Sequence, residues 1–166
     1  MEADITGARL NVNGEAVDLP VKLKVHQSIF VPLAKWAMLL TGNYRCVQAD
    51  GMRAIKDAVH SDLEKSREVY EWVVGLCVLL GASRDDMVPF DKYAAAGTGL
   101  LKPSSAARAL AAGATDIERI DLLVKLVAEQ KGLCHASVSE TVKLINGWLE
   151  RNRKAAAIHA AVAEAA

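Results

Sequence analysis

The stretch PSSAARALAAGATDIERIDLLVKLVAEQKGL, residues 103–133, decides the predicted fold because it reads as two helices separated by a glycine. Ser104 to Ala112 form a short helix between a proline and that glycine. Thr115-Asp116-Ile117-Glu118 then has the spacing of a capping box, which begins a second helix. We therefore expect two helix starts that each present a polar side chain, Ser104 and Asp116. The second helix carries an apolar stripe: Ile117, Ile120, Leu123, Val124 and Val127.

Helical periodicity continues on both sides of this stretch. Ser61-Asp62-Leu63-Glu64 and Ser137-Val138-Ser139-Glu140 are two more capping boxes, predicted to open a long helix that ends at Gly81 and the last helix of the chain. An earlier helix is predicted from Ser28 to Gly42, on an apolar stripe of Ile29, Leu33, Trp36, Ala37 and Leu40. Shorter helices are predicted at residues 50–59, 83–87 and 89–96.

The composition agrees with a helical interior. Apolar residues make up 52% of the 166 residues but aromatic residues only 5%, so the core must be built mainly from aliphatic side chains and alanine. Such a composition favours closely packed helices. The length is about that of one domain. The fold class predicted from these observations is all-α.

The charge balance argues against two kinds of partner. Twenty basic and twenty acidic residues cancel, and no stretch concentrates the Lys and Arg that neutralise a nucleic acid or an anionic lipid. We therefore expect no nucleic acid and no membrane as partner. The start MEADITGARL lacks the apolar region of a signal peptide, and the longest apolar run, residues 73–80, is too short to span a bilayer. The sequence predicts a soluble, cytoplasmic protein.

The cysteines and histidines do not have metal-ligand spacing. Three cysteines stand far apart without a CxxC pair, and the four histidines have no i,i+4 pairing and no neighbouring carboxylate at ligand spacing. We expect reduced thiols with packing roles and histidines at the surface or at helix caps. No metal site is predicted.

An N-terminal segment differs from the rest of the chain. Residues 8–25 alternate apolar and polar side chains around Asn13-Gly14, a dipeptide that suits a tight hairpin turn. Two strands alone are marginal in water, so we expect them to lean on the helices or on another sheet. The predicted organisation is a β-hairpin segment over residues 1–25 and a helical domain over residues 26–166.

The stretch 103–133 resembles the C-terminal helical domain of ketopantoate reductases, which has the fold of the 6-phosphogluconate dehydrogenase C-terminal domain. In that family Ser-Ser-Met-x-Gln-Asp-Leu is followed, after a short gap, by Thr-Glu-Ile-Asp and a helix ending near a glycine. Ser104 falls on the substrate-binding serine and Asp116 on the active-site glutamate. Upstream, FVPLAKWAMLLTGN is similar to the family's Trp-x-Lys-x-x-x-Asn-x-x-x-Asn helix, which places Lys35 on the catalytic lysine and Asn43 on the second asparagine.

The resemblance implies an NADP-dependent oxidoreductase of pantothenate biosynthesis. In that family a Rossmann domain binds NADPH, and hydride passes to the 2-keto group of ketopantoate. A lysine ammonium such as that of Lys35 can polarise the ketone and deliver a proton. The amide of Asn43 and the hydroxyl of Ser104 would then hold the substrate, and Asp116 would accept from a substrate hydroxyl.

The chain departs from the family pattern in several places. Asp116 is one methylene shorter than glutamate, Leu39 replaces the first asparagine, and Tyr44-Arg45-Cys46 replaces Pro-Leu-Thr. No GxGxxG follows a strand before Lys35, so we expect no cofactor bound by this chain alone. NADPH, and with it catalytic activity, would require a separate or additional Rossmann domain.

Simpler interpretations of the four residues remain open. Ser104 is also a helix cap, Asp116 a first-turn acid, Lys35 a surface lysine and Asn43 a helix-terminating residue. Two functions follow. The first is the substrate-binding half of a ketopantoate reductase-like enzyme, with a small keto or hydroxy acid as ligand. The alternative is a non-catalytic helical module that uses its former domain interface for a homodimer or another partner.

Overall fold

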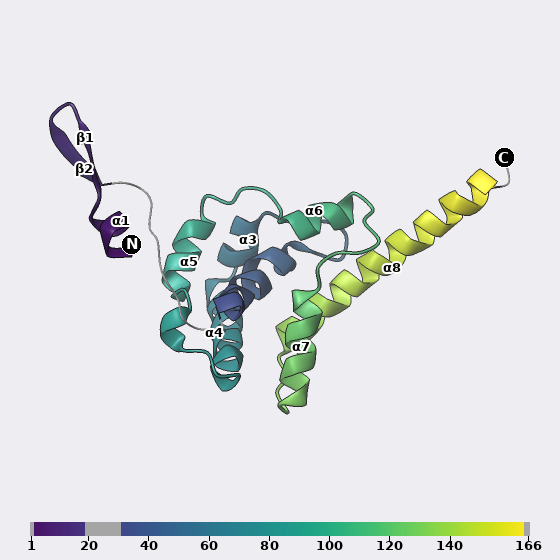
Figure 1. Ribbon diagram of the computed structural model, residues 1–166. Helices are drawn as coiled ribbons and strands as arrows, with labels where there is room; N and C mark the ends of the chain where they lie inside the picture. Colours follow the sequence, from purple (N-terminus) through teal and green to yellow (C-terminus); the bar gives the residue numbers. More distant parts are fainter. Residues whose placement is uncertain (1, 19–30, 165–166) are drawn as a thin grey trace.

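The computed structural model describes residues 2–18 and 31–164, and the chain is mostly helical with one small antiparallel hairpin (Figure 1). This confirms the predicted mainly helical class. The N-terminal part holds helix α1 (Glu2–Gly7), which was not predicted, and strands β1 (Arg9–Val12) and β2 (Glu15–Asp18). Four short helical elements follow each other without a break: η1 (Val31–Lys35), α2 (Trp36–Met38), η2 (Leu39–Asn43) and η3 (Tyr44–Cys46). The remaining elements are α3 (Ile55–His60), α4 (Leu63–Leu79), η4 (Arg84–Asp86), α5 (Phe90–Gly97), α6 (Ser105–Ala111), α7 (Ile120–Gln130) and α8 (Ala136–Glu164).

The hairpin forms where its turn dipeptide predicted. Asn13 and Gly14 both have positive φ, 54° and 92°, as a two-residue hairpin turn requires. Its apolar side chains remain exposed: Leu10, Val12 and Val17. In Figure 1 the hairpin and α1 stand away from the helical body. Residues 19–25 of the predicted hairpin segment lie outside the described residues.

Helix α4 is the centre of the core. One side of it is fully buried through Val69, Tyr70, Val73 and Leu76, and the Tyr70 ring stacks on Tyr93 of α5 with centroids 5.4 Å apart. Each fully buried aliphatic side chain contributes about 1.5–3 kcal/mol. The helix ends where predicted, with Gly81 at φ 106°.

Gly42 does not end its helix, and that prediction is wrong. The backbone passes through Gly42 in the π-helical turn η2, in which the Tyr44 N–H donates to the Leu39 carbonyl. A Cβ at residue 42 would lie 2.0 Å from the Tyr93 hydroxyl oxygen. The Tyr93 hydroxyl itself donates to the Met38 carbonyl at 3.1 Å. A glycine is therefore needed at residue 42 because α5 approaches closely there, and not because a helix ends.

Two of the predicted capping serines are not caps. Helix α4 is capped by Asp62, whose carboxylate accepts from the Lys65 N–H at 2.9 Å. At the start of α8 the Ser137 N–H donates to His135 Nδ1 at 3.2 Å. Ser61 instead accepts from Arg53. In both places a neighbouring side chain with a better-placed acceptor replaces the serine.

Helix α8 divides into two halves. Its first half packs into the body through Val138, Val142, Ile145 and Leu149, whereas Ile158 and Val162 are exposed. Figure 1 shows the second half running out beyond the other helices.

Within residues 2–18 and 31–164, no helix is both long enough and apolar enough to cross a membrane. All three cysteines are free thiols; Cys46 and Cys77 are buried, as packing residues would be, while Cys134 is exposed.

Candidate functional site

Ser104 connects the start of α6 to the end of η2. Its hydroxyl accepts from the Ala107 N–H at 3.2 Å, which caps α6, and donates to the Asn43 carbonyl at 2.7 Å. The side chain is buried, so both bonds are shielded from water. One hydroxyl therefore places two of the predicted site residues next to each other, although they are 61 positions apart in the chain.

Two hollows are lined by residues at this contact. The serine hollow, of about 450 Å³, is lined by Asn43 and Ser104 together with Ile55 and residues 99–103, 105 and 108. The aspartate hollow, of about 330 Å³, is lined by Asn43 and Asp116 together with Leu39, Tyr44, Ser105, Ala106, Ala109, Ile117 and Glu118. Asn43 belongs to both. The structure thus brings together three of the four predicted site residues.

Asp116 lies in a loop and not at the start of a helix. Helix α7 begins at Ile120, so the prediction that it opens at the capping box 115–118 is wrong. The reason is the phenol of Tyr44, which donates to the Glu118 carbonyl at 2.8 Å and accepts from the Ile120 N–H at 3.1 Å. Tyr44 thereby satisfies an N-terminal amide of α7 that a local cap would otherwise serve.

The electrostatics of this loop depend on two arginines. Asp121 is fully buried and receives two hydrogen bonds of 2.9 Å from Arg119. Asp116 is exposed and receives one of 2.6 Å from Arg153, which holds the pKa of its carboxyl below the usual range. Burial raises the pKa of Tyr44 to about 12, so its hydroxyl keeps its proton at physiological pH. The aspartate hollow therefore presents an ionised carboxylate beside a neutral phenol.

Lys35 lines neither hollow and is exposed at the end of η1. It precedes Leu39 by four residues, and Leu39 does line the aspartate hollow. In an uninterrupted α-helix, residues eight apart are rotated by about 80° from each other. The π turn at Leu39–Asn43 takes more residues per turn and reduces that rotation. The π turn therefore brings the side chains of Lys35, Leu39 and Asn43 closer to one face of the segment than an uninterrupted α-helix would.

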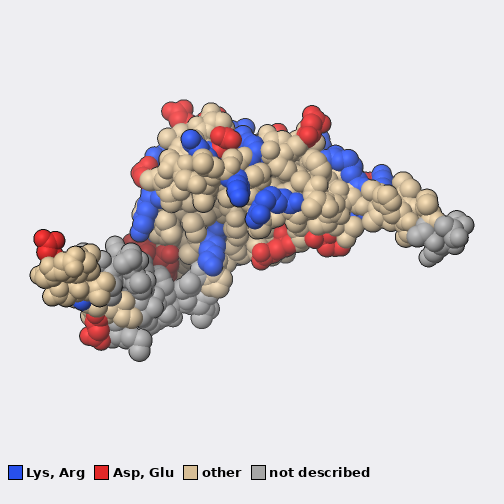
Figure 2. All heavy atoms as spheres, turned by 90° about the horizontal axis from the view of Figure 1, so that it is seen from above, with Lys and Arg blue, Asp and Glu red and all other residues tan. Residues whose placement is uncertain are grey.

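The arrangement offers an amide donor and an ionised carboxylate but few groups for other chemistry. Across the described part of the chain, nothing in the protein hydrogen-bonds the side-chain amide of Asn43, so it can donate to a ligand. In the same residues no group of three His, Cys, Asp or Glu side chains could hold a metal ion. On the face shown in Figure 2, basic and acidic residues are interspersed without a continuous area of one sign.

Sequence reasoning missed two residues that organise the site. Tyr44 holds the loop that carries Asp116, and Arg153 of α8 holds the Asp116 carboxylate. Tyr44 was visible as a departure from the family's Pro-Leu-Thr, but its partners are far away in the chain. Arg153 carries no local signal, because it lies in a helix among other charged residues.

Comparisons with known proteins add no identity: no protein-family model matches the chain, and no curated protein and no solved structure matches it significantly.

Proposed function

We propose that this chain is the substrate-binding half of an NADP-dependent oxidoreductase of the ketopantoate reductase type, with the helical architecture of the 6-phosphogluconate dehydrogenase C-terminal domain. The observation that supports it most is the position of Asn43, which shares one hollow with Ser104 and the other with Asp116. These are three of the four residues named by the resemblance. The ligand that suits them is a small keto or hydroxy acid.

Each group has a task in binding such an acid. The Asn43 amide donates to the substrate carboxylate, and the ionised Asp116 accepts from a substrate hydroxyl. Arg153 limits the reach of Asp116, because substrate and arginine compete for the same carboxylate. The hydroxyl of Ser104 already donates to the Asn43 carbonyl, so its role in this chain is to position Asn43.

Lys35 is the proposed source of the proton. Its ammonium polarises the keto oxygen and then protonates the alkoxide that forms. When a Rossmann domain holds it, NADPH supplies the hydride for the carbonyl carbon. The residues of this chain bind and orient the acid, and Lys35 must reach it from one helical turn before Leu39.

The apolar rim of the serine hollow favours the proposal that another domain covers it. Leu100 and Leu101 line it and are 43% and 69% exposed. Surface of this kind beside a polar hollow is usually covered by a partner. In the proposed enzyme that partner is the Rossmann domain.

The proposal is tested by titrating ketopantoate and pantoate while following backbone amide shifts and melting temperature. We expect shifts at residues 39–44, 104–108 and 115–118. Asn43→Asp should abolish binding, because it places a negative charge beside the substrate carboxylate, and Lys35→Ala should weaken it. Lys92→Ala on α5, exposed and outside both hollows, is the control. Absence of binding, or equal binding by Asn43→Asp, contradicts the proposal.

The same exposed leucines favour the second candidate, a non-catalytic module that forms a homodimer or binds another partner through this rim. Sedimentation of the protein and of Leu101→Glu over a range of concentrations separates the two candidates. A dimer that Leu101→Glu dissociates, in a protein that binds neither acid, supports the second. A monomer that binds pantoate supports the first.

A further inference from the structure

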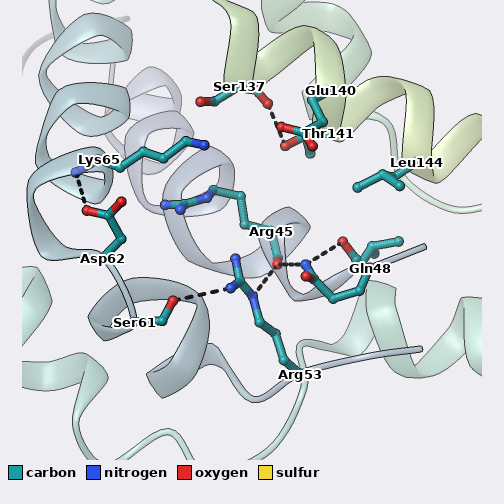
Figure 3. Close-up of a pocket in the computed structure, with 11 residues that line it drawn as sticks. Arg45, Gln48, Arg53, Ser61, Asp62, Lys65, Ser137, Glu140, Thr141 and Leu144 are labelled. Atoms are coloured by element: carbon teal, nitrogen blue, oxygen red, sulfur yellow. Dashed lines mark hydrogen bonds between the residues drawn. The ribbon is translucent and has the colours of Figure 1, made fainter. Parts of the chain in front are cut away.

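A third hollow shares no lining residue with the two described above. This arginine hollow, of about 260 Å³, is lined by Arg45, Val47, Gln48, Arg53, Ser61, Asp62, Lys65, Ser137, Glu140, Thr141 and Leu144. Its walls come from η3, the loop after it, the turn before α4 and the first turns of α4 and α8 (Figure 3). Asn43, Ser104 and Asp116 do not line this hollow.

Three cationic side chains, those of Arg45, Arg53 and Lys65, line the arginine hollow. Arg45 is 9% exposed and donates to the Ser66 hydroxyl at 2.9 Å and the Thr41 carbonyl at 3.3 Å. Arg53 donates to the Arg45 carbonyl and the Ser61 hydroxyl. Among the described residues, neither these arginines nor Lys65 forms an ion pair.

The carboxylates that line the hollow balance this positive charge only in part, since three cationic side chains face two carboxylates. Burial lowers the pKa of Arg45, and the nearby charge of Arg53 lowers it further. A buried guanidinium beside a second one is costly unless an anion compensates. The two carboxylates of the hollow only partly do so: Asp62 caps α4 through the Lys65 N–H, and Glu140 lies on the other wall.

The two walls of the hollow differ in chemistry. Figure 3 shows the ends of Arg45, Arg53 and Lys65 on one side, with Glu140, Thr141 and Leu144 of α8 on the other. The Thr141 hydroxyl donates to the Ser137 carbonyl at 2.8 Å and still has acceptor capacity. One wall therefore suits an oxyanion, and the other suits hydroxyl groups that donate to Glu140 and Thr141.

We propose that the arginine hollow binds a small phosphorylated molecule, with the phosphate group on Arg45, Arg53 and Lys65 and its hydroxyl-bearing part toward Glu140 and Thr141. Planar guanidinium groups bind phosphate oxygens in pairs, and Lys65 adds a point charge. The hollow is separate from the proposed substrate site, so it is either a regulatory site or a site for a second ligand.

The experiment titrates the protein with inorganic phosphate and with glycerol 3-phosphate, at ionic strength held constant with sodium chloride. We expect saturable amide shifts at residues 45–53, 61–65 and 137–141 and a rise in melting temperature. The phosphate ester should bind more tightly than phosphate. Arg53→Gln and Lys65→Gln should each weaken binding by about tenfold, the order of one charge-assisted hydrogen bond.

Lys92→Gln serves as the matched control, because it removes the same charge from an exposed site outside the hollow. Lys65→Gln decides the question if Arg53→Gln fails to fold, since the Lys65 side chain makes no described hydrogen bond. The proposal is overturned if neither ligand gives saturable shifts at these residues. It is equally overturned if Lys65→Gln binds as tightly as Lys92→Gln.

Discussion

The two sides of the segment Leu39–Cys46 carry different kinds of site. On one side Asn43 and Tyr44 are fixed by neutral hydrogen bonds to main-chain groups, and the charge of Asp116 stays at the surface. On the other side Arg45 carries a charge into the interior. Neutral bonds to the backbone give precise placement at little electrostatic cost, whereas a buried charge demands compensation. Asn43 and Tyr44 are therefore held at little electrostatic cost, whereas in our proposal a bound anion compensates the charge of Arg45.

The largest effect on stability is expected from a substitution in the segment that both sides share. Gly42→Ala places a methyl group 2.0 Å from the Tyr93 hydroxyl oxygen and 3.2 Å from Ile55 Cγ2. Because Tyr93 is buried and stacked on Tyr70, it has little room to move. We expect a loss of about 2–3 kcal/mol in the free energy of unfolding, measured by urea denaturation.

Two controls separate this clash from a general effect of alanine. Gly75→Ala on the exposed side of α4 meets no atom within 4 Å and should stabilise the protein by about 0.5–1 kcal/mol. Tyr93→Phe removes the clashing oxygen, so Gly42→Ala should cost less in that background. Equal costs in the two backgrounds would show that Tyr93 is not the reason for the glycine.

A smaller loss is expected from Tyr44→Phe, which affects only the Asn43 side. The change leaves the Glu118 carbonyl and the Ile120 N–H without their partner. We expect a loss of about 1–2 kcal/mol and faster hydrogen exchange at residues 117–121. Unchanged exchange there would mean that the loop before α7 is held by other contacts.

Ser104→Ala tests the link between α6 and η2. It removes the cap of α6 and the bond to the Asn43 carbonyl, for an expected loss of about 1 kcal/mol in thermal or urea unfolding. Ser105→Ala is the matched control, because Ser105 is the exposed neighbour with no described side-chain hydrogen bond. Equal losses in the two variants would argue against the link.

The smallest effect on stability is expected from Arg153→Gln, which sharpens the contrast between surface and buried charge. The pKa of the Asp116 carboxyl, now lowered by Arg153, should rise toward its ordinary value, as a carboxyl NMR titration would show. The melting temperature near neutral pH should hardly change, because the pair is exposed. A large drop in melting temperature would give Arg153 a structural role.

Sequence reasoning succeeded where the determinants are local. The hairpin turn at Asn13-Gly14, the span of α4 and its stop at Gly81 follow from residue periodicity and backbone preference, and the structure confirms them. It failed where a side chain far away in the sequence decides the local structure. Gly42 looked like a helix stop because nothing in the sequence near it indicates the contact with Tyr93 of α5. The late start of α7 was missed because Tyr44, which bonds the Ile120 N–H, is 76 positions away in the chain.

The candidate site was predictable only in part. The resemblance predicted that Asn43, Ser104 and Asp116 would lie together, and nothing in their spacing alone requires it. Lys35 was expected in the same hollow and stands outside both hollows. The three basic side chains of the arginine hollow were not predicted, because they come from three separate positions in the chain and none of them is part of a motif.

The π turn at Leu39–Asn43 places one extra residue in a run of short helical elements. Tyr44 and Arg45, which follow it, are turned by about 100° from where an uninterrupted α-helix would put them. Deleting a single codon in this turn would keep the residues Tyr44 and Arg45 but rotate both away from their hollows. The two sites would then be lost in one step, even if the deleted residue were Leu40 or Thr41, which line none of the three hollows.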